Sequence, residues 1–493
     1  MNVKRHLMKT AVTALVTGLI LLAAFGCSSD SDKIPITTSS KDARDYYLMG
    51  RNLAEMLRHQ EAQLYFQKAV KADSNFAMAY LQLAYTEPTT QSYFEYLDKA
   101  LALKDSVSEG ERLYILATQA GMDGELSQRQ KYLEDIIKLY PNDERAYMYL
   151  GNFYFSLQEW KKAIEQYNKT IAVNEDFSPI YNQLGYAYRY LGDFDSAEKA
   201  FRKYVKLNPE DPNPYDSYAE LLLKMGKYSA SIDSYEEALK QDPRFIPSYL
   251  GIATNWNLKG RHDRARKELQ RLLEIAKTDY ERRNAYYAMA VSFADEGRYE
   301  DAVNMMEKEL AVSTAAGDNV SMANDNIGIG GILYEMGRYD EAMERFLRAN
   351  AIVQKAGVAA TLKMNSERTL QYQRARVALG KGDLATARSE AEDYMKRAVA
   401  EENPFRKWAA HELFGRIALK EKDYDRAIEE LQQTGADNPY NLYRLALAYE
   451  GAGNIEKAKE YLVQTIEYRM PNNMNWAFCR TKAKEKLDSL TAT

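Results

Sequence analysis

The residue types that most often perform catalysis or bind metals are scarce in this sequence. Four histidines and two cysteines stand among 493 residues, whereas a structural zinc site alone needs four nitrogen or sulfur ligands close together. His59, His262 and His411 lie far apart in the chain, and Cys479 stands beside the aromatic residues Trp476 and Phe478 in a helical segment. We therefore expect these residues to have structural roles, and we expect no metal site and no cofactor.

Two other patterns with possible chemistry also favour packing. The string NIGIGGILYEMG contains Gly328, Gly330 and Gly331, but no strand precedes it, and Leu333 stands where a dinucleotide-binding loop needs its third glycine. We expect these glycines to let two helices approach closely. The acidic residues are scattered along helical segments without an evident acid–base pair. The sequence is therefore predicted not to be an enzyme.

The overall charge argues against nucleic acid as a partner. The formal net charge is −5, and it becomes −8 without the three basic residues of segment 1–26, which holds no acidic residue. Nucleic acid is bound by basic surfaces because its backbone carries a negative charge at every phosphate. We expect no nucleic-acid partner.

Cys27 is the one cysteine with an evident chemical role. The basic residues Lys4, Arg5 and Lys9 precede an uncharged, mostly apolar run, as in a secretory signal. The run ends in LAAFG before Cys27, and this end resembles a bacterial lipoprotein signal. The resemblance implies that segment 1–26 is removed and that a lipid on Cys27 attaches the chain to a membrane. A retained transmembrane anchor is the alternative, but the apolar run is near the lower length limit for spanning a bilayer.

The residues after Cys27 suggest a destination. Ser28 beside the cysteine resembles the outer-membrane class of lipoproteins, which implies a chain that faces the periplasm. Residues 27–42 are polar and lack apolar periodicity. We expect this segment to be a flexible tether.

A repeated helical pattern occupies the remainder of the chain. Prolines are few, and apolar residues recur at three- and four-residue steps, which indicates helices. A small residue recurs at a spacing of 33 or 34 residues up to residue 253 and at 31 to 45 residues thereafter. These aligned small residues are Gly50, Ala84, Ala117, Gly151, Gly185, Ala219, Ala253, Ala290, Gly330, Ala375, Gly415 and Ala446. In most repeats a second small residue follows twelve positions later, as Ala197 follows Gly185.

This period and the paired small residues resemble the tetratricopeptide repeat family. The resemblance implies an all-α fold: an α-solenoid, wound as a right-handed superhelix, of about twelve helix pairs and a C-terminal capping helix. We divide the array into regular repeats at 43–277, longer repeats of 40 to 45 residues at 278–402, and C-terminal units with the capping helix at 403–493.

The family geometry also predicts a binding groove. First helices line the concave side, and the exposed inner residues stand at steps five, nine, twelve and thirteen of a unit in which the aligned small residue is step eight. In units four to six the predicted groove residues are Met148, Asn152, Phe155, Asn182, Tyr186, Arg189, Tyr190, Asp216 and Glu220. Asparagine can bond an extended peptide backbone, and tyrosine offers rigid contact area. The alternative is that these tyrosines only cover the seams between units.

These observations predict a non-enzymatic, lipid-anchored scaffold that binds proteins or peptides in the bacterial cell envelope. Two alternatives stay open. A tyrosine-rich groove also suits stacking on sugars, which would fit a polysaccharide- or peptidoglycan-associated module for secretion or envelope biogenesis. The stretch NPYNLYRLALAYEGAGNIEKAKEYL resembles terminal repeats of some bacterial kinase- and cyclase-associated repeat proteins, which would fit a regulatory partner of a signalling enzyme.

Overall fold

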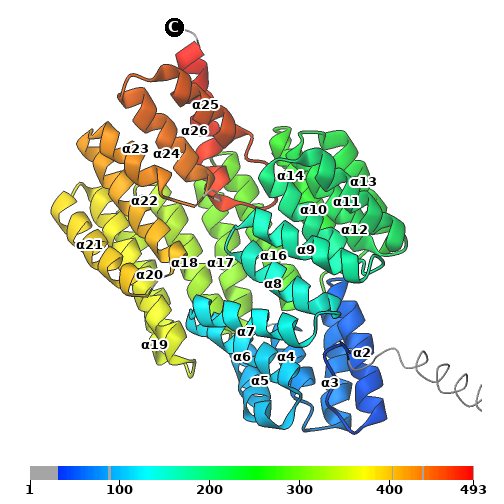
Figure 1. Cartoon of the computed structure of the whole chain (residues 1–493). Coiled ribbons are helices and arrows are strands. Elements are labelled where there is room, and N and C mark those ends of the chain that lie inside the picture. The colour runs from blue at the N-terminus through cyan, green and yellow to red at the C-terminus, as the bar shows by residue number, and fades with distance from the viewer. Residues whose placement is uncertain (1–31, 87–89, 402, 436–437, 492–493) are drawn as a thin grey trace, which may run out of the picture.

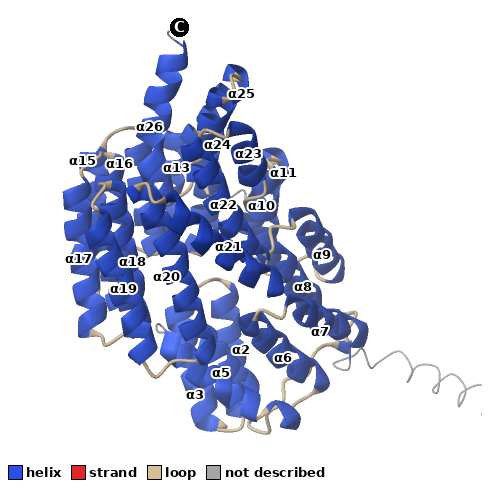
Figure 2. Cartoon of the chain, turned by 90° about the vertical axis from the view of Figure 1, so that its left-hand side faces the viewer, coloured by secondary structure: helices blue, strands red, loops and turns tan. Residues whose placement is uncertain are grey.

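The structure, a computed structural model, describes residues 32–86, 90–401, 403–435 and 438–491. These residues form α-helices and one short 3₁₀ helix, η2 (Lys104–Ser106), and contain no strand (Figure 2). Twelve consecutive helix pairs, which we number as units one to twelve, are followed by a last helix, α26 (Met474–Thr491). The predicted solenoid of helix pairs is confirmed. None of the helices described is both long and apolar enough to span a membrane.

The two helices of each unit alternate along the chain. The first helices are α2 (Lys41–Glu55), α4 (Ala77–Thr86), α6 (Glu109–Asp123), α8 (Glu144–Ser156), α10 (Pro179–Leu191), α12 (Pro212–Lys224), α14 (Ile246–Leu258), α16 (Asp279–Asp295), α18 (Asn319–Glu335), α20 (Ala360–Lys381), α22 (Pro404–Glu421) and α24 (Pro439–Gly451). The second helices are α3 (His59–Ala72), α5 (Thr90–Ala102), α7 (Leu126–Leu139), α9 (Trp160–Val173), α11 (Phe194–Leu207), α13 (Tyr228–Gln241), α15 (His262–Ile275), α17 (Tyr299–Ala315), α19 (Tyr339–Lys355), α21 (Leu384–Ala400), α23 (Tyr424–Gln432) and α25 (Ile455–Ile466). The longer repeats are accommodated by longer helices, as α20 illustrates with 22 residues against 13 in α10.

In the five units whose aligned small residue is glycine, that glycine faces a large residue on the second helix. A Cβ atom added to Gly185 would lie 2.6 Å from the ring of Phe201, and one added to Gly330 would lie 2.5 Å from the ring of Phe346. Both large residues follow their glycine by sixteen positions, on the second helix of the same unit. The close helix approach predicted for Gly330 is confirmed.

The turn between the two helices has an unusual backbone conformation in the units whose turn the structure describes. Gly192 ends α10 with a φ of 80°, in the left-handed region that side chains disfavour. Lys422 adopts a φ of 64° at the corresponding turn of unit eleven, where the sequence has KDYD in place of the usual glycine. The fold therefore imposes this conformation even where glycine is absent.

The last helix both caps the array and folds back across it. Helix α26 packs on α24 and α25, as a capping helix should, and also on α16 of unit eight (Figure 1). Arg480 forms an ion pair of 2.6 Å with Asp295, and Lys482 forms one of 2.8 Å with Glu335. The prediction of a cap is confirmed, but it missed these contacts, which join parts of the chain about 150 to 185 residues apart.

The described part of the expected tether is bound rather than free. Residues 33–38 run extended over the first helices of the N-terminal units. The backbone N–H of Ile34 donates to Asp143 at 2.8 Å, and that of Thr37 donates to Glu111 at 2.9 Å. We call this segment the strap. The expectation of flexibility missed it because polar residues without periodicity can still bond acceptors far away in the sequence.

Two adjacent glycines of α18 test the importance of the small residues. We expect Gly330→Ala to lower the free energy of unfolding by about 1–3 kcal/mol, because the new methyl group overlaps the ring of Phe346. The control is Gly331→Ala, whose Cβ meets nothing within 4 Å. It should raise that free energy by up to about 1 kcal/mol, since alanine restricts the unfolded chain and favours helix. Chemical denaturation followed by circular dichroism measures both, and equal effects would contradict the packing argument.

Candidate functional site

The nine predicted groove residues lie on three neighbouring first helices. Helix α10 contacts both α8 and α12, and we call the side of the array on which the predicted groove steps of the first helices lie the inner surface. Met148, Asn152 and Phe155 lie on α8, the four residues from Asn182 to Tyr190 on α10, and Asp216 and Glu220 on α12. Their inner-side position is consistent with the geometry expected for a groove. Their role in binding stays a prediction.

An ion pair between buried Arg189 and partly exposed Glu220 lies on this surface. Arg189 donates to Glu220 over 2.9 Å, and its guanidinium lies 4.8 Å from the ring centre of Tyr186 and 5.1 Å from that of Tyr190. Only 4% of Arg189 is exposed. Its charge is therefore neutralised inside the protein, and its planar face is covered by the two rings.

An aromatic group lies beside the ion pair at the junction of units four and five. The rings of Trp160 and Tyr190 stack with centres 4.5 Å apart, and Phe155 packs against both rings edge to face. All three residues are partly exposed. Nearby, Asn152 accepts a hydrogen bond of 2.9 Å from the hydroxyl of Tyr167. The aromatic group offers rigid contact area with part of each ring facing solvent.

Among the acidic residues of this surface, Asp216 has the most strongly shifted pKa. It is buried, and Ser248 donates a hydrogen bond to it at 2.7 Å. Burial raises the pKa of Asp216 well above its ordinary value, and the neighbouring Glu220 raises it further. The carboxyl group of Asp216 therefore favours its protonated form.

The expectation that all nine residues are exposed is wrong. Met148, Asn182, Arg189 and Asp216 are buried, with exposed fractions between 4% and 9%. The physical reason is that successive first helices touch one another, so that the next unit covers side chains on this side. Asn152, Phe155, Tyr186, Tyr190 and Glu220 are the partly exposed members of the set.

A second inner cluster escaped the sequence analysis. Glu412 accepts hydrogen bonds from the hydroxyl of Tyr372 at 2.7 Å and from Arg444 at 3.0 Å, and Arg416 lies 3.4 Å away. Burial alone would raise the pKa of Glu412, but Arg444, Arg416 and the hydrogen bond from Tyr372 lower it to about 2. Tyr372 and Glu412 stand at step five of units ten and eleven, and Arg416 stands at step nine. Applying the same step rule to these units would have found the cluster.

The C-terminal segment occupies these same steps in units seven to nine. Asp295 and Glu335 stand at step thirteen and bind Arg480 and Lys482 of α26. Thr254 stands at step nine and accepts a hydrogen bond of 3.3 Å from a backbone N–H in the loop before α26. Part of the inner surface is thus filled by the chain itself.

His262, His411 and Cys479 have partners or packing that account for them. His262 lies 2.8 Å from Asp295, and His411 lies 2.8 Å from Glu430. Cys479 is buried, and burial raises the pKa of its thiol to about 12, which disfavours the reactive thiolate. Among the described residues, no group of three or more histidine, cysteine, aspartate or glutamate side chains could hold a metal ion.

The raised pKa of Asp216 predicts a pH dependence of stability. The folded chain retains a proton that the unfolded chain releases above its ordinary pKa of 3.8, so stability should fall as the pH rises from about 4 towards the folded pKa. Asp216→Asn keeps an acceptor for Ser248 but cannot ionise. The melting temperature of this variant, relative to that of the wild type, should therefore increase as the pH rises from 4 to 8. Asp176→Asn, at an exposed site, is the control and should follow the wild type at every pH.

Comparison with known proteins identifies the repeat. Sequence models of the tetratricopeptide repeat match residues 43–76, 151–189, 178–211, 218–280, 281–355 and 440–468, which together make up more than half of the chain. The anaphase-promoting complex subunit CDC16 of Saccharomyces cerevisiae is 27% identical over 42% of this chain and 26% of its own length. The Hsp70-Hsp90 organising protein of Plasmodium falciparum is 27% identical over 30% of this chain and 59% of its own length.

A solved tetratricopeptide repeat protein of Parabacteroides merdae is 16% identical and covers 52% of this chain and 97% of its own, with a TM-score of 0.37. This chain spans about a quarter of the length of the first curated relatives that it matches. The matched repeats coincide with the helix pairs of the structure. The chain belongs to the tetratricopeptide repeat proteins.

Proposed function

We propose that this protein is a non-enzymatic scaffold that binds a protein segment on the inner surface of units four to six. The observation that carries the proposal is the partly exposed aromatic group of Phe155, Trp160 and Tyr190, held in place by stacking and by the adjacent ion pair of Arg189. Aromatic residues held in fixed positions tend to dominate the energy of protein binding. Two relatives support this reading by name, because one is a subunit of a complex and the other an organising protein.

We further propose that the scaffold is anchored by a lipid on Cys27 at the bacterial outer membrane and faces the periplasm. Cys27 and the signal-like segment lie outside the described residues. The support is the sequence pattern: basic residues, an uncharged apolar run, a small residue before Cys27, and Ser28 after it.

A polysaccharide ligand is the second candidate. The rings of Trp160 and Tyr190 stack on each other with planes 9° apart, and an outer ring face of such a stack is a surface on which a sugar ring can stack. Binding of purified peptidoglycan to the isolated protein, lost in Tyr190→Ala, would favour this candidate over a protein segment.

The anchor is tested by metabolic labelling. Cys27→Ser should abolish incorporation of a labelled fatty acid and should leave the precursor unprocessed, because the thiol that accepts the lipid is gone. Cys479→Ser is the control and should retain full labelling, since Cys479 is buried in α26. Labelling that persists in Cys27→Ser would contradict the anchor.

The binding surface is tested by crosslinking in intact cells and identification of the captured protein. Replacing Phe155 and Tyr190 together with alanine should lower capture at least tenfold, since loss of two aromatic contacts removes at least about 1.4 kcal/mol of binding energy. The matched control replaces two exposed aromatic residues elsewhere, Tyr280 and Phe405, which are 56% and 43% exposed. Equal loss of capture in both variants would contradict the assignment of the surface.

A further inference from the structure

The strap is held as a bound peptide would be held. Its backbone supplies the N–H groups of Ile34 and Thr37, and the carbonyl oxygen of Ile36 accepts a hydrogen bond of 2.7 Å from Arg44. The hydroxyl of Thr37 donates to Glu111 and accepts from the backbone of Ser108 at 3.1 Å. The hydroxyl of Thr38 donates to Asp73 at 2.5 Å, and Lys33 forms an ion pair of 2.6 Å with Glu144. Recognition therefore combines main-chain bonds with side-chain bonds from two threonines and a lysine, which is a usual mode for a bound peptide segment.

The groups that bind the strap are positioned without it. Asp143 caps α8 by accepting from the backbone N–H of Arg145 at 2.8 Å. Glu111 forms a capping box with Ser108 at the start of α6. Both carboxylates stand at helix N-termini, where a negative charge is favourable. The receptor surface, which we call the strap groove, should therefore persist when the strap leaves.

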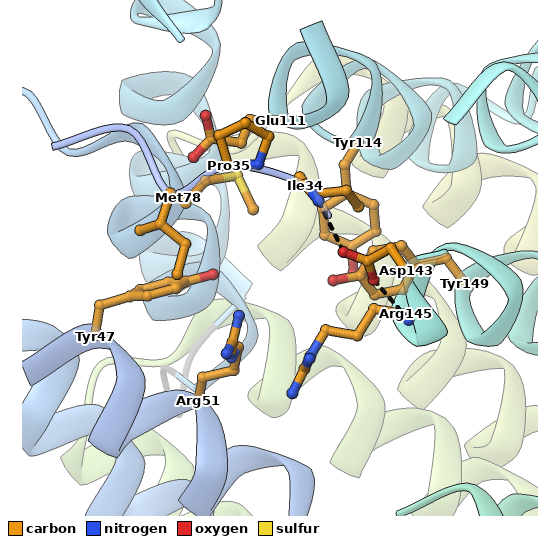
Figure 3. A pocket seen from close by; sticks show the side chains of 11 residues that line it. Ile34, Pro35, Tyr47, Arg51, Met78, Glu111, Tyr114, Asp143, Arg145 and Tyr149 are labelled. Carbon is orange, nitrogen blue, oxygen red and sulfur yellow. Dashed lines mark hydrogen bonds between the residues drawn. The ribbon is translucent and has the colours of Figure 1, made fainter. Parts of the chain in front are cut away.

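The strap does not fill the groove completely. A cavity of about 30 Å³ remains between Ile34, Pro35 and Ile36 of the strap and the side chains beneath them, and its walls include Tyr47, Met78, Tyr114 and Tyr149 (Figure 3). Arg51 also lines the cavity; its Nε lies 4.0 Å from the carboxylate of Glu55 and has no hydrogen-bond partner among the described residues. A ligand with a larger side chain or an acceptor near Arg51 would fit this space better than the strap does.

We propose that the strap groove is a peptide-binding site that the chain occupies with its own strap until a foreign segment replaces it. The partner is an extended segment of another protein, with an apolar residue, proline and a second apolar residue followed by threonine or serine. The unfilled cavity and Arg51 favour a foreign segment over the strap of a second copy, which would fit no better than the chain's own. The partner class rests on the proposed function of protein binding, but the site differs from the surface of units four to six.

The experiment uses a fluorescent peptide with the sequence of residues 31–40, SDKIPITTSS, and measures anisotropy with the purified protein. In the wild type the attached strap competes at an effective concentration in the millimolar range. The strap variant Ile34→Asp with Thr37→Val should release the strap, because it places a carboxylate beside Asp143 and removes the hydroxyl bound by Glu111. The peptide should bind this variant at least tenfold more tightly than the wild type.

Two controls bracket the result. Ser39→Val removes a hydroxyl from an exposed strap-side position and should bind the peptide as weakly as the wild type. Glu111→Gln added to the strap variant should weaken peptide binding at least tenfold, while thermal melting shows that the fold is kept. If the strap variant fails to fold, Thr37→Val alone takes its place. We then expect a smaller gain in peptide affinity.

Hydrogen exchange completes the test. Residues 33–38 should exchange faster in the strap variant than in the wild type. Unchanged exchange there, or fast exchange without tighter peptide binding, would overturn the proposal. A dimer of the wild-type protein in sedimentation would assign the groove to the strap of a second copy and overturn the assignment to a foreign segment. These measurements depend on neither the lipid anchor nor the aromatic group of units four and five. Failure of the strap proposal would therefore leave the proposed function untouched, and the reverse also holds.

Discussion

In five of the twelve units, a glycine on the first helix contacts a large residue sixteen positions later on the second helix, and this contact sets how closely the two helices of the unit approach. Where glycine is the small residue, as at Gly185 and Gly330, the ring on the second helix approaches so closely that even a methyl group would overlap it. This contact fixes the distance between the helices of a unit. It thereby fixes how units stack, because each unit presents a surface of constant shape to the next. The inner surface is a consequence of that stacking rather than a separately built site.

Stacking alone leaves the carboxylates of units eight and nine in an unfavourable place. Asp295 and Glu335 are the last residues of α16 and α18, where the helix dipole disfavours a negative charge. Arg480 and Lys482 of α26 supply the compensating charges. Burial alone would raise the pKa of Glu335, but the charge and hydrogen bond of Lys482 outweigh burial and lower it. Helix α26 thus caps the array and also supplies the positive charges that compensate these two carboxylates.

Features that depend on residues within one repeat were predicted from the sequence. Features that depend on contacts between residues far apart in the chain were missed. The helix pairs and the close approach at Gly330 follow from local spacing and were predicted correctly. The binding of the strap to Asp143 and the pairing of Arg480 with Asp295 join residues more than 100 positions apart. No periodic pattern in the sequence indicates such contacts. Exposure at the groove was mispredicted for the same reason, since the next unit decides whether a side chain such as that of Asn182 is covered.

The inner surface handles buried charge in two opposite ways, and the difference constrains any ligand. Arginines lower the pKa of Glu412, whereas burial and the neighbouring Glu220 raise the pKa of Asp216. Arg189 is a third case, because its charge is already neutralised by Glu220. A partner that reaches units four to six therefore meets no unpaired charge from Arg189. Its affinity must come mainly from contact with the aromatic group, and its binding should depend only weakly on salt, because few charges would be screened.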